Sequence, residues 1–260
     1  NAMEILVCIK QVPDDSVEIF LNENTQKPDL EKVTPVVNAF DTYALEMAVR
    51  LKEAAGGEVT VLSVGDDSVK NSLKNCMAVG ADHAYLCKLD DYNETDTFTI
   101  AQSLKESKEE IEKQTGKTFD IIFCGKESTD FASAQVGPVL AEMMDIPVIT
   151  GIVDIEEKDG GVETRQETEE DYHVISCQGL CLVTVNKPKY YPRYPTIKSK
   201  MAARKKAIDE LDTAKAGVTV LHTEKVYTPA KRSAGVKIQA ESAEEAVAQA
   251  MDLMKKAKVF

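Results

Sequence analysis

Residues 118–144 read TFDIIFCGKESTDFASAQVGPVLAEMM. The run 119–124 is short and apolar and is followed by Gly125, which predicts a buried β-strand. A polar loop follows, and from residue 131 or 132 to 144 apolar residues recur at helical spacing, up to a stop near Pro147. A strand, a polar loop and a helix in this order predict one β–α unit of a parallel sheet.

The same unit recurs on both sides of this stretch. Further buried strands are predicted at residues 3–9, 59–64, 83–87 and 148–153, with helices at 38–55, 68–79 and 96–114. Asn38 is expected to cap its helix, with the Asp41 carboxylate reaching back to the cap. Strands that are apolar on both faces are typical of a parallel sheet covered by helices, which right-handed crossovers make doubly wound. The fold class is therefore α/β.

The pattern changes after residue 154. Short alternating segments around Gly160-Gly161, ending with residues 180–185, predict antiparallel strands added at an edge of the sheet. A basic segment with three prolines follows at residues 187–206, and residues 242–258 predict an amphipathic helix. We expect an α/β nucleotide-binding domain at 3–206 and a C-terminal arm at 207–260 that contacts a partner.

Charge and cysteine usage limit the function classes. The formal net charge is −13, although segment 187–206 carries eight basic residues and no acid. An acidic body argues against nucleic-acid binding, and no apolar run is long enough to insert into a membrane. Without an export signal, the six cysteines predict reduced thiols and a cytoplasmic protein. Cys177 and Cys181 lack the second pair or histidine cluster that a metal site needs.

Residues 126–138 form a polar loop that leads into the start of a helix. This loop is the best candidate for a binding site, because helix N-termini suit phosphate groups. From spacing alone, phosphate binding and a plain turn remain equally good interpretations. The usual dinucleotide and P-loop motifs are absent, and none of the three histidines is placed for catalysis. If the protein takes part in redox chemistry, a cofactor must therefore carry it.

Several motifs in the same order give the chain a resemblance to the beta subunit of electron transfer flavoprotein, over nearly its whole length. They are Val7-Cys8-Ile9-Lys10, Val12-Pro13-Asp14, residues 38–46 (NAFDTYALE), Gly125-Lys126 with Asp130, residues 134–138 (AQVGP), residues 192–195 (PRYP) with Lys198, and residues 234–237 (AGVK). The resemblance implies a heterodimer with an alpha subunit and a second adenine nucleotide in this chain. That nucleotide is AMP in simple members and FAD, reduced by NADH, in electron-bifurcating members.

By position, the resemblance implies a set of cofactor-binding residues, many of which would act through their backbone. They are Cys8, Asn38, Asp41, Val64, Ser133, Ala134, Gln135, Val136 and Gly137, with Lys10 and Asp14 toward a flavin ring. The triplet Val12-Pro13-Asp14 resembles the bifurcating or nitrogen-fixation-type branch and favours FAD over AMP. Phe131 and Ala132 depart from the pattern D-G-D-T-A-Q-V-G of many members, so phosphate contacts at these two positions are in doubt.

The basic segment matches the family's docking loop for acyl-CoA dehydrogenases and related flavoproteins. Prolines pre-organise an exposed loop, and tyrosine and arginine are enriched at interfaces. A solvated basic helix is the alternative. For the whole chain, an alternative to electron transfer is a structural AMP-binding role, and a remote one is an ATP-cleaving enzyme on a related sheet. Any NADH-oxidising activity would need the alpha subunit.

Overall fold

A computed structural model describes residues 2–214 and 220–259 of the chain. The chain divides into two compact units, Asn1–Val226 and Tyr227–Phe260, each of which is described by itself. The arm expected at 207–260 includes residues 215–219, which lie outside the described residues. The first unit extends past residue 206, because residues 209–211 form a strand of its sheet.

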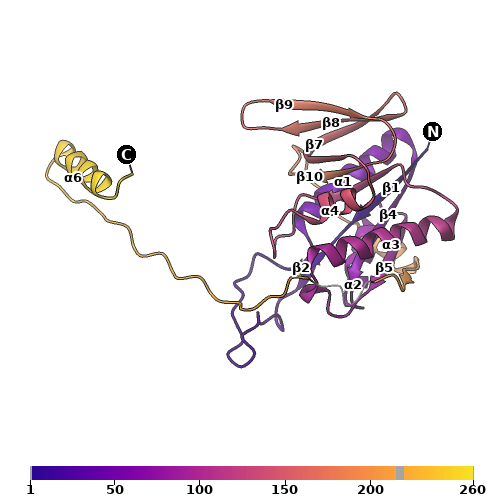
Figure 1. The fold of residues 1–260 in the computed structure, drawn as a ribbon, viewed down its shortest axis with the longest axis horizontal. Coiled ribbons are helices and arrows are strands. Elements are labelled where there is room, and N and C mark those ends of the chain that lie inside the picture. Colours follow the sequence, from indigo (N-terminus) through magenta and orange to yellow (C-terminus); the bar gives the residue numbers. More distant parts are fainter. Residues whose placement is uncertain (1, 215–219, 260) are drawn as a thin grey trace. The chain divides into compact units, whose positions relative to one another are not determined.

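In the described part of the chain, one sheet has nine strands in the order β11-β5-β4-β1-β6-β10-β7-β8-β9. Figure 1 shows β9, β8, β7, β10, β1, β4 and β5 following one another in this order from top to bottom. Neighbouring strands are parallel from β11 to β7, and β8 and β9 extend the sheet in antiparallel fashion. The strands in sheet order are β11 (Asp209–Leu211), β5 (His83–Lys88), β4 (Gly57–Gly65), β1 (Met3–Cys8), β6 (Ile121–Gly125), β10 (Cys181–Val185), β7 (Val148–Lys158), β8 (Gly161–Glu167) and β9 (Tyr172–Cys177). The α/β class with an antiparallel extension is confirmed.

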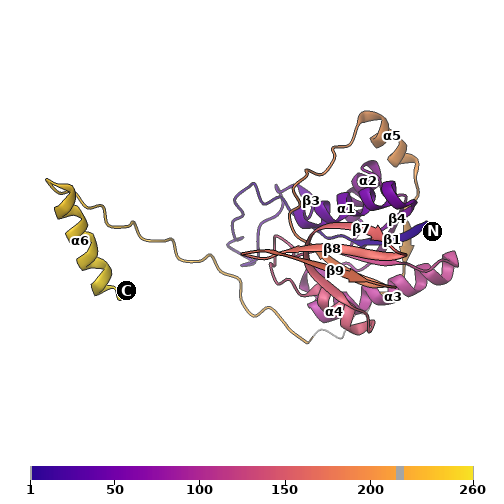
Figure 2. The ribbon, with the colours of Figure 1, turned by 90° about the horizontal axis from the view of Figure 1, so that it is seen from above.

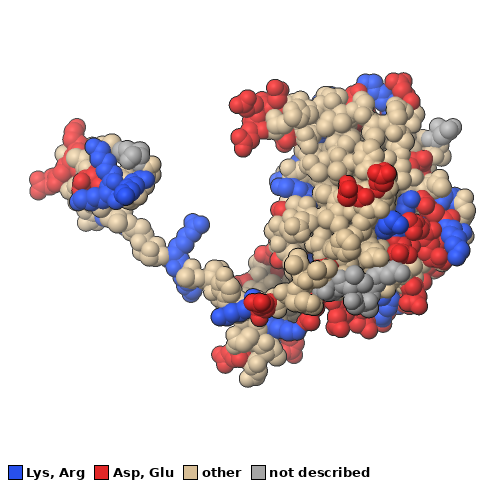
Figure 3. Space-filling model, viewed as in Figure 1, with Lys and Arg blue, Asp and Glu red and all other residues tan. Residues whose placement is uncertain are grey.

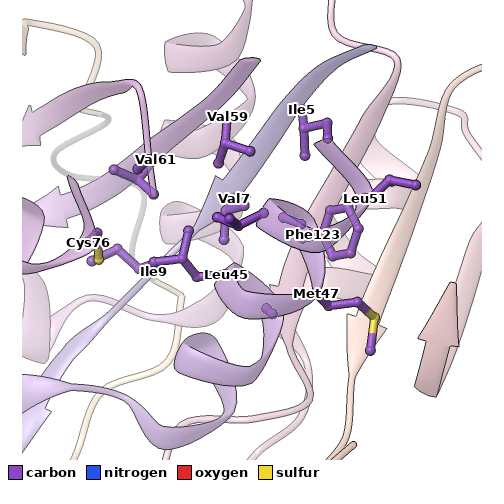
Figure 4. Close-up of a cluster of buried hydrophobic side chains, with 14 of the residues drawn as sticks. Ile5, Val7, Ile9, Leu45, Met47, Leu51, Val59, Val61, Cys76 and Phe123 are labelled. Atoms are coloured by element: carbon purple, nitrogen blue, oxygen red, sulfur yellow. The ribbon is translucent and has the colours of Figure 1, made fainter. Parts of the chain in front are cut away.

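Helices cover both faces of the parallel part. The first unit's helices are α1 (Ala39–Ala55), α2 (Val69–Ala78), the 3₁₀ turn η1 (Tyr92–Glu94), α3 (Thr97–Thr115), α4 (Val136–Met143) and α5 (Ile197–Lys205). Because side chains alternate along a strand, Ile5 and Val7 pack toward α1 and α2 while Leu6 and Cys8 pack toward α3 and α4. Figure 4 shows the first of these two cores, with Phe123 between Leu51 and Met47. The sheet is therefore doubly wound.

The predicted position of residues 180–185 was wrong. Instead of an antiparallel edge strand, β10 is parallel to both neighbours and lies inside the sheet between β6 and β7. After β7 the chain extends the sheet outward through β8 and β9 and then returns to insert β10 between β6 and β7, a connection that local sequence does not specify. Between β2 (Gln11–Pro13) and β3 (Pro35–Val37), which form a short antiparallel ribbon, residues 14–34 hold an isolated antiparallel bridge between Leu21 and Pro28.

Charged side chains are mixed over α3, whereas acidic side chains gather at one end of the β8–β9 hairpin (Figure 3). In Figure 2, α5 lies beside α2 on one side of the sheet, consistent with their packing against each other. No helix among the described residues has the length and apolar character needed to cross a bilayer.

The second unit contains the helix α6 (Ala243–Lys256), close to the bounds expected for it. The Ser242 hydroxyl caps its first turn by accepting a hydrogen bond from the Glu245 amide at 3.2 Å. None of its side chains is buried, although Val247 and Met251 lie on one apolar face.

Candidate functional site

A cavity opens at the carboxyl ends of β1, β4 and β6, where ligands of doubly wound sheets bind. The cavity has a volume of about 140 Å³ and is partly open to solvent. The strand ends supply an apolar floor from Cys8, Val64 and Cys124, while loop 126–135 and the first turn of α4 form a polar wall.

Asn38 and Asp41 connect this floor to the loop. The Asn38 amide donates to the Glu127 carbonyl oxygen at 2.7 Å and accepts from the Thr129 amide at 3.0 Å. The Asp41 carboxylate accepts from the Lys10 amide at 2.7 Å and from the Gly125 amide at 3.0 Å. Asn38 is the N-cap residue of α1 as expected, but the expected side-chain capping is wrong. Both side chains instead bind the backbone that follows β1 and β6.

Burial sets the protonation of Asp41. The side chain is only 5% exposed, and desolvation raises its pKa to about 7 despite hydrogen bonds from Lys10, Asn38 and Gly125 that favour the ionised form. The group that joins the two strand ends therefore titrates close to neutral pH.

Loop 126–135 is longer than its sequence predicts. The expected helix start at residue 131 or 132 was wrong, since α4 begins at Val136. Ala132 and Ala134 adopt left-handed backbone conformations, with φ of 50° and 54°, which a helix does not allow. The loop thus turns back over the cavity, which Ser133, Ala134 and Gln135 line, before the helix starts.

The first turn of α4 faces the cavity through Val136 and Gly137. No side chain caps this turn, so its N–H groups keep the donor capacity and partial positive charge that suit a phosphate. Gly137 also lets α4 approach the sheet, because a Cβ there would lie 2.7 Å from Thr184 Cγ2. The residues present therefore fit the phosphate end of an adenine nucleotide.

Lys10 closes one side of the cavity mouth. Its ammonium group contacts both carboxylate oxygens of Asp130 at 2.9 and 2.8 Å and lies 4.3 Å from the centre of the Phe131 ring. Phe131, 58% exposed, therefore stands at the rim beside a cation. These contacts fasten the loop after β6 to the end of β1.

The structure brings together all but one of the cofactor-binding residues that the family resemblance implies. The cavity is lined by Cys8, Lys10, Asn38, Asp41, Val64, Ser133, Ala134, Gln135, Val136 and Gly137. Asp14 lies outside it; its carboxylate accepts a hydrogen bond from the Ser16 amide at 2.9 Å, and hydrogen bonds from Ser16 lower its pKa. That these residues bind a nucleotide stays a prediction.

Sequence reasoning missed the wall that follows β5. Tyr92, Asn93, Thr95 and Thr97 line the cavity from η1 and the start of α3, with Ile100 and Leu104 below them. The available signal was the end of the strand predicted at 83–87, since the carboxyl ends of parallel strands meet at one edge.

The basic segment 187–206 forms a second surface, outside the cavity. Tyr191 and Tyr194 are 81% and 90% exposed, and α5 continues this apolar face with Ile197 and Met201. Arg193 differs from the tyrosines because its guanidinium is paired within the chain, with Glu46 and Glu53. The segment is thus an ordered loop and helix with an exposed apolar face in basic surroundings.

Comparison with known proteins identifies the family. The electron transfer flavoprotein domain matches residues 30–216. Electron transfer flavoprotein subunit beta of Megasphaera elsdenii is 37% identical over 254 residues, covering 94% of each chain. Acryloyl-CoA reductase electron transfer subunit gamma of Anaerotignum propionicum is 30% identical, covering 91% of this chain and 92% of the relative. Protein FixA of Sinorhizobium fredii is 30% identical, covering 83% and 76%. The chain therefore belongs to the electron transfer flavoprotein family and is related to its beta subunits.

Proposed function

We propose that this chain is the beta subunit of an electron transfer flavoprotein heterodimer and binds FAD in the cavity at the carboxyl ends of β1, β4 and β6. The observation that carries the proposal is the convergence on one cavity of residues from five separate parts of the chain, around an uncapped helix N-terminus. Together with an alpha subunit, the chain would pass electrons between NADH, flavins and a partner dehydrogenase.

The chain's own residues would divide the binding of this cofactor. Ser133, Gln135 and the first N–H groups of α4 would hold phosphates, because they combine polar donors with the positive end of the helix dipole. Cys8 and Val64 would contact the adenine with apolar surface. Lys10 would lie toward the flavin ring. When bound, the flavin would accept a hydride from NADH.

FAD is favoured over AMP by the Val12-Pro13-Asp14 triplet, which resembles the bifurcating or nitrogen-fixation-type branch. With AMP, the chain would stabilise the heterodimer and dock partners without redox chemistry of its own. The two cases differ in flavin content. Visible absorbance measures that content, because FAD absorbs visible light and AMP does not.

Segment 187–206 would dock an acyl-CoA dehydrogenase-type flavoprotein. Its exposed tyrosines and α5 side chains supply apolar contact area, and its lysines favour a partner with an acidic surface. The name of the acryloyl-CoA reductase relative, an electron transfer subunit, supports a partner of this class.

Nucleotide titration of bulky variants tests the site. Ser133→Trp and Gln135→Trp place an indole where the cavity wall turns over the ligand, so both should lower FAD and AMP affinity at least about tenfold. Gln178→Trp, on the exposed chain between β9 and β10, is the matched control and should bind as the wild type does. Unchanged affinity in the first two variants would contradict the site assignment. Pyrophosphate release from ATP would favour an ATP-cleaving enzyme instead.

A further inference from the structure

Side chains in the docking segment point alternately toward and away from the body of the protein. Tyr190 is half-buried and packs on the Arg50 guanidinium, 3.9 Å from the centre of the Tyr190 ring. Tyr191 and Tyr194 are the most exposed aromatic side chains among the described residues. The segment therefore has an inner side that contacts α1 and an outer side that faces solvent.

Arg193 makes the strongest of the inner contacts. Its backbone N–H and its Nε both donate to Glu46 Oε2, at 3.0 and 2.9 Å. Its two terminal nitrogens donate to the carboxylate of Glu53, at 2.6 and 3.0 Å. The planar guanidinium thus joins two carboxylates two turns apart on α1, which a lysine could not do with the same geometry.

Glu46 is an unusual partner because it is 4% exposed. Burial alone would raise its pKa, but hydrogen bonds from Arg193 and Arg50 outweigh that effect and hold the pKa below its ordinary value. Removing one of its two cations from a buried carboxylate costs stability, and Glu46 would then keep only Arg50, so the buried carboxylate holds Arg193 in place. The contact is specific in a way that an exposed ion pair is not.

The other end of the segment is fastened separately. Thr196 and Ser199 form a reciprocal capping box at the start of α5, and Ala203 is buried against the body. The Lys74 ammonium on α2 donates to the carbonyl oxygens of Ala203 and Arg204 at 3.3 and 3.2 Å, and also to that of Lys206. The outward residues Tyr194, Ile197 and Met201 lie between these two attachments.

We propose that Arg193 is a positioning residue whose ion pairs with Glu46 and Glu53 hold Tyr194, Ile197 and Met201 in the arrangement that a flavoprotein partner binds. The inference rests on the proposed docking function of segment 187–206. Arg193 then acts on docking through α1 and not by touching the partner. Without the ion pairs of Arg193, the loop becomes ordered only when the partner binds. This ordering cost weakens association but does not alter electron transfer in the bound complex.

The test uses the heterodimer with its alpha subunit and a purified bacterial acyl-CoA dehydrogenase as the probe. The anchor variants are Arg193→Met, Arg193→Lys, Glu46→Gln and the double variant Arg193→Met/Glu46→Gln. Arg204→Met, which removes one positive charge from the same segment, is the charge control, and Tyr194→Ala tests direct docking. Each protein is measured for partner KM and kcat, nucleotide content, and amide hydrogen exchange of residues 187–206.

Arg193→Met should raise KM for the dehydrogenase about tenfold, with kcat and nucleotide content unchanged. The free energy of ordering several side chains on binding is large enough to weaken association by about this factor. Exchange at residues 190–196 should speed up in Arg193→Met and Glu46→Gln but not in Arg204→Met. Arg193→Lys should recover only part of the loss. The double variant should be no worse than Arg193→Met alone, since the two residues act as one unit.

The outcomes separate this inference from the docking function itself. An unchanged KM in Arg193→Met, while Tyr194→Ala raises KM, would overturn the positioning role and leave docking intact. An equal rise in Arg193→Met and Arg204→Met, without faster exchange, would overturn it in favour of a simple charge contact. An unchanged KM in Tyr194→Ala would overturn docking and positioning together, even if exchange in Arg193→Met shows that the anchor orders the loop.

Discussion

Asp41 connects two strand ends that are far apart in sequence, because its two carboxylate oxygens accept from the amides of Lys10 and Gly125. Its folded pKa of about 7 lies above the ordinary value of 3.8, so the folded chain holds this proton more tightly than the unfolded chain does. Its contribution to stability is therefore fully present below about pH 4 and is lost as the pH rises through 7.

Asp41→Asn should remove this pH dependence, because an amide does not titrate. Between pH 5 and pH 8, the free energy of unfolding of the wild type should fall relative to that of Asp41→Asn by up to a few kcal/mol. Urea unfolding at the two pH values measures the difference. A gap between the two proteins that stays constant with pH would contradict the assigned pKa shift.

Lys10 belongs to the same scale, because a single ammonium group holds Asp130 and Phe131 at the cavity mouth. Lys10→Met should loosen loop 126–135 and lower FAD affinity by roughly five- to tenfold, with little effect on global stability. Lys158→Met, which breaks a comparable ion pair with Glu163 away from the cavity, is the control. Equal FAD titration curves for the two variants would rule out a role for Lys10 in closing the site.

At the scale of elements, loop 126–135 depends on backbone conformations that most residues avoid. Ala134 has φ of 54°, which a β-branched side chain disfavours and glycine accepts readily. Ala134→Val should destabilise the loop by about 1–2 kcal/mol and lower nucleotide occupancy, whereas Ala134→Gly should keep occupancy near that of the wild type. The nucleotide content of the two purified variants tests this prediction. An equal loss of nucleotide in both variants would mean that the Ala134 side chain matters and not its backbone conformation.

The sequence predicted the parallel strands and most helices because these elements carry local signals: apolar runs, helical spacing, and glycines at their ends. Ten of the eleven expected site residues line one cavity because they follow or face the carboxyl ends of neighbouring parallel strands. Asp14 does not, because β2 leads the chain away into a short ribbon with β3.

Two elements were placed wrongly for different physical reasons. The start of α4 depends on left-handed conformations at Ala132 and Ala134. Alanine rarely adopts this conformation, so its presence in the sequence does not predict it. The place of β10 depends on a long-range connection through the β8–β9 hairpin. A clue was present, because Leu182, Val183 and Val185 form part of a nearly continuous apolar run, typical of a strand buried on both faces.

At the scale of the whole molecule, the exposed apolar faces of α5 and α6 fit a chain that works in a complex. The face on α5 belongs to the proposed docking surface. The amphipathic α6, with no buried side chain of its own, belongs to the arm that we propose contacts a partner. If the alpha subunit covers α6, amide exchange in residues 243–256 should slow in the heterodimer relative to the isolated chain. Equal exchange in the two samples would contradict this contact.

The nucleotide content of the heterodimer shows whether this chain binds FAD in its cavity. The chain is co-expressed with its alpha subunit, the purified complex is denatured, and the released FAD and AMP are counted per heterodimer. We predict two FAD and no AMP, with one FAD lost when Ser133→Trp blocks the cavity of this chain. One FAD and one AMP would contradict this prediction and make this chain a structural, partner-docking subunit.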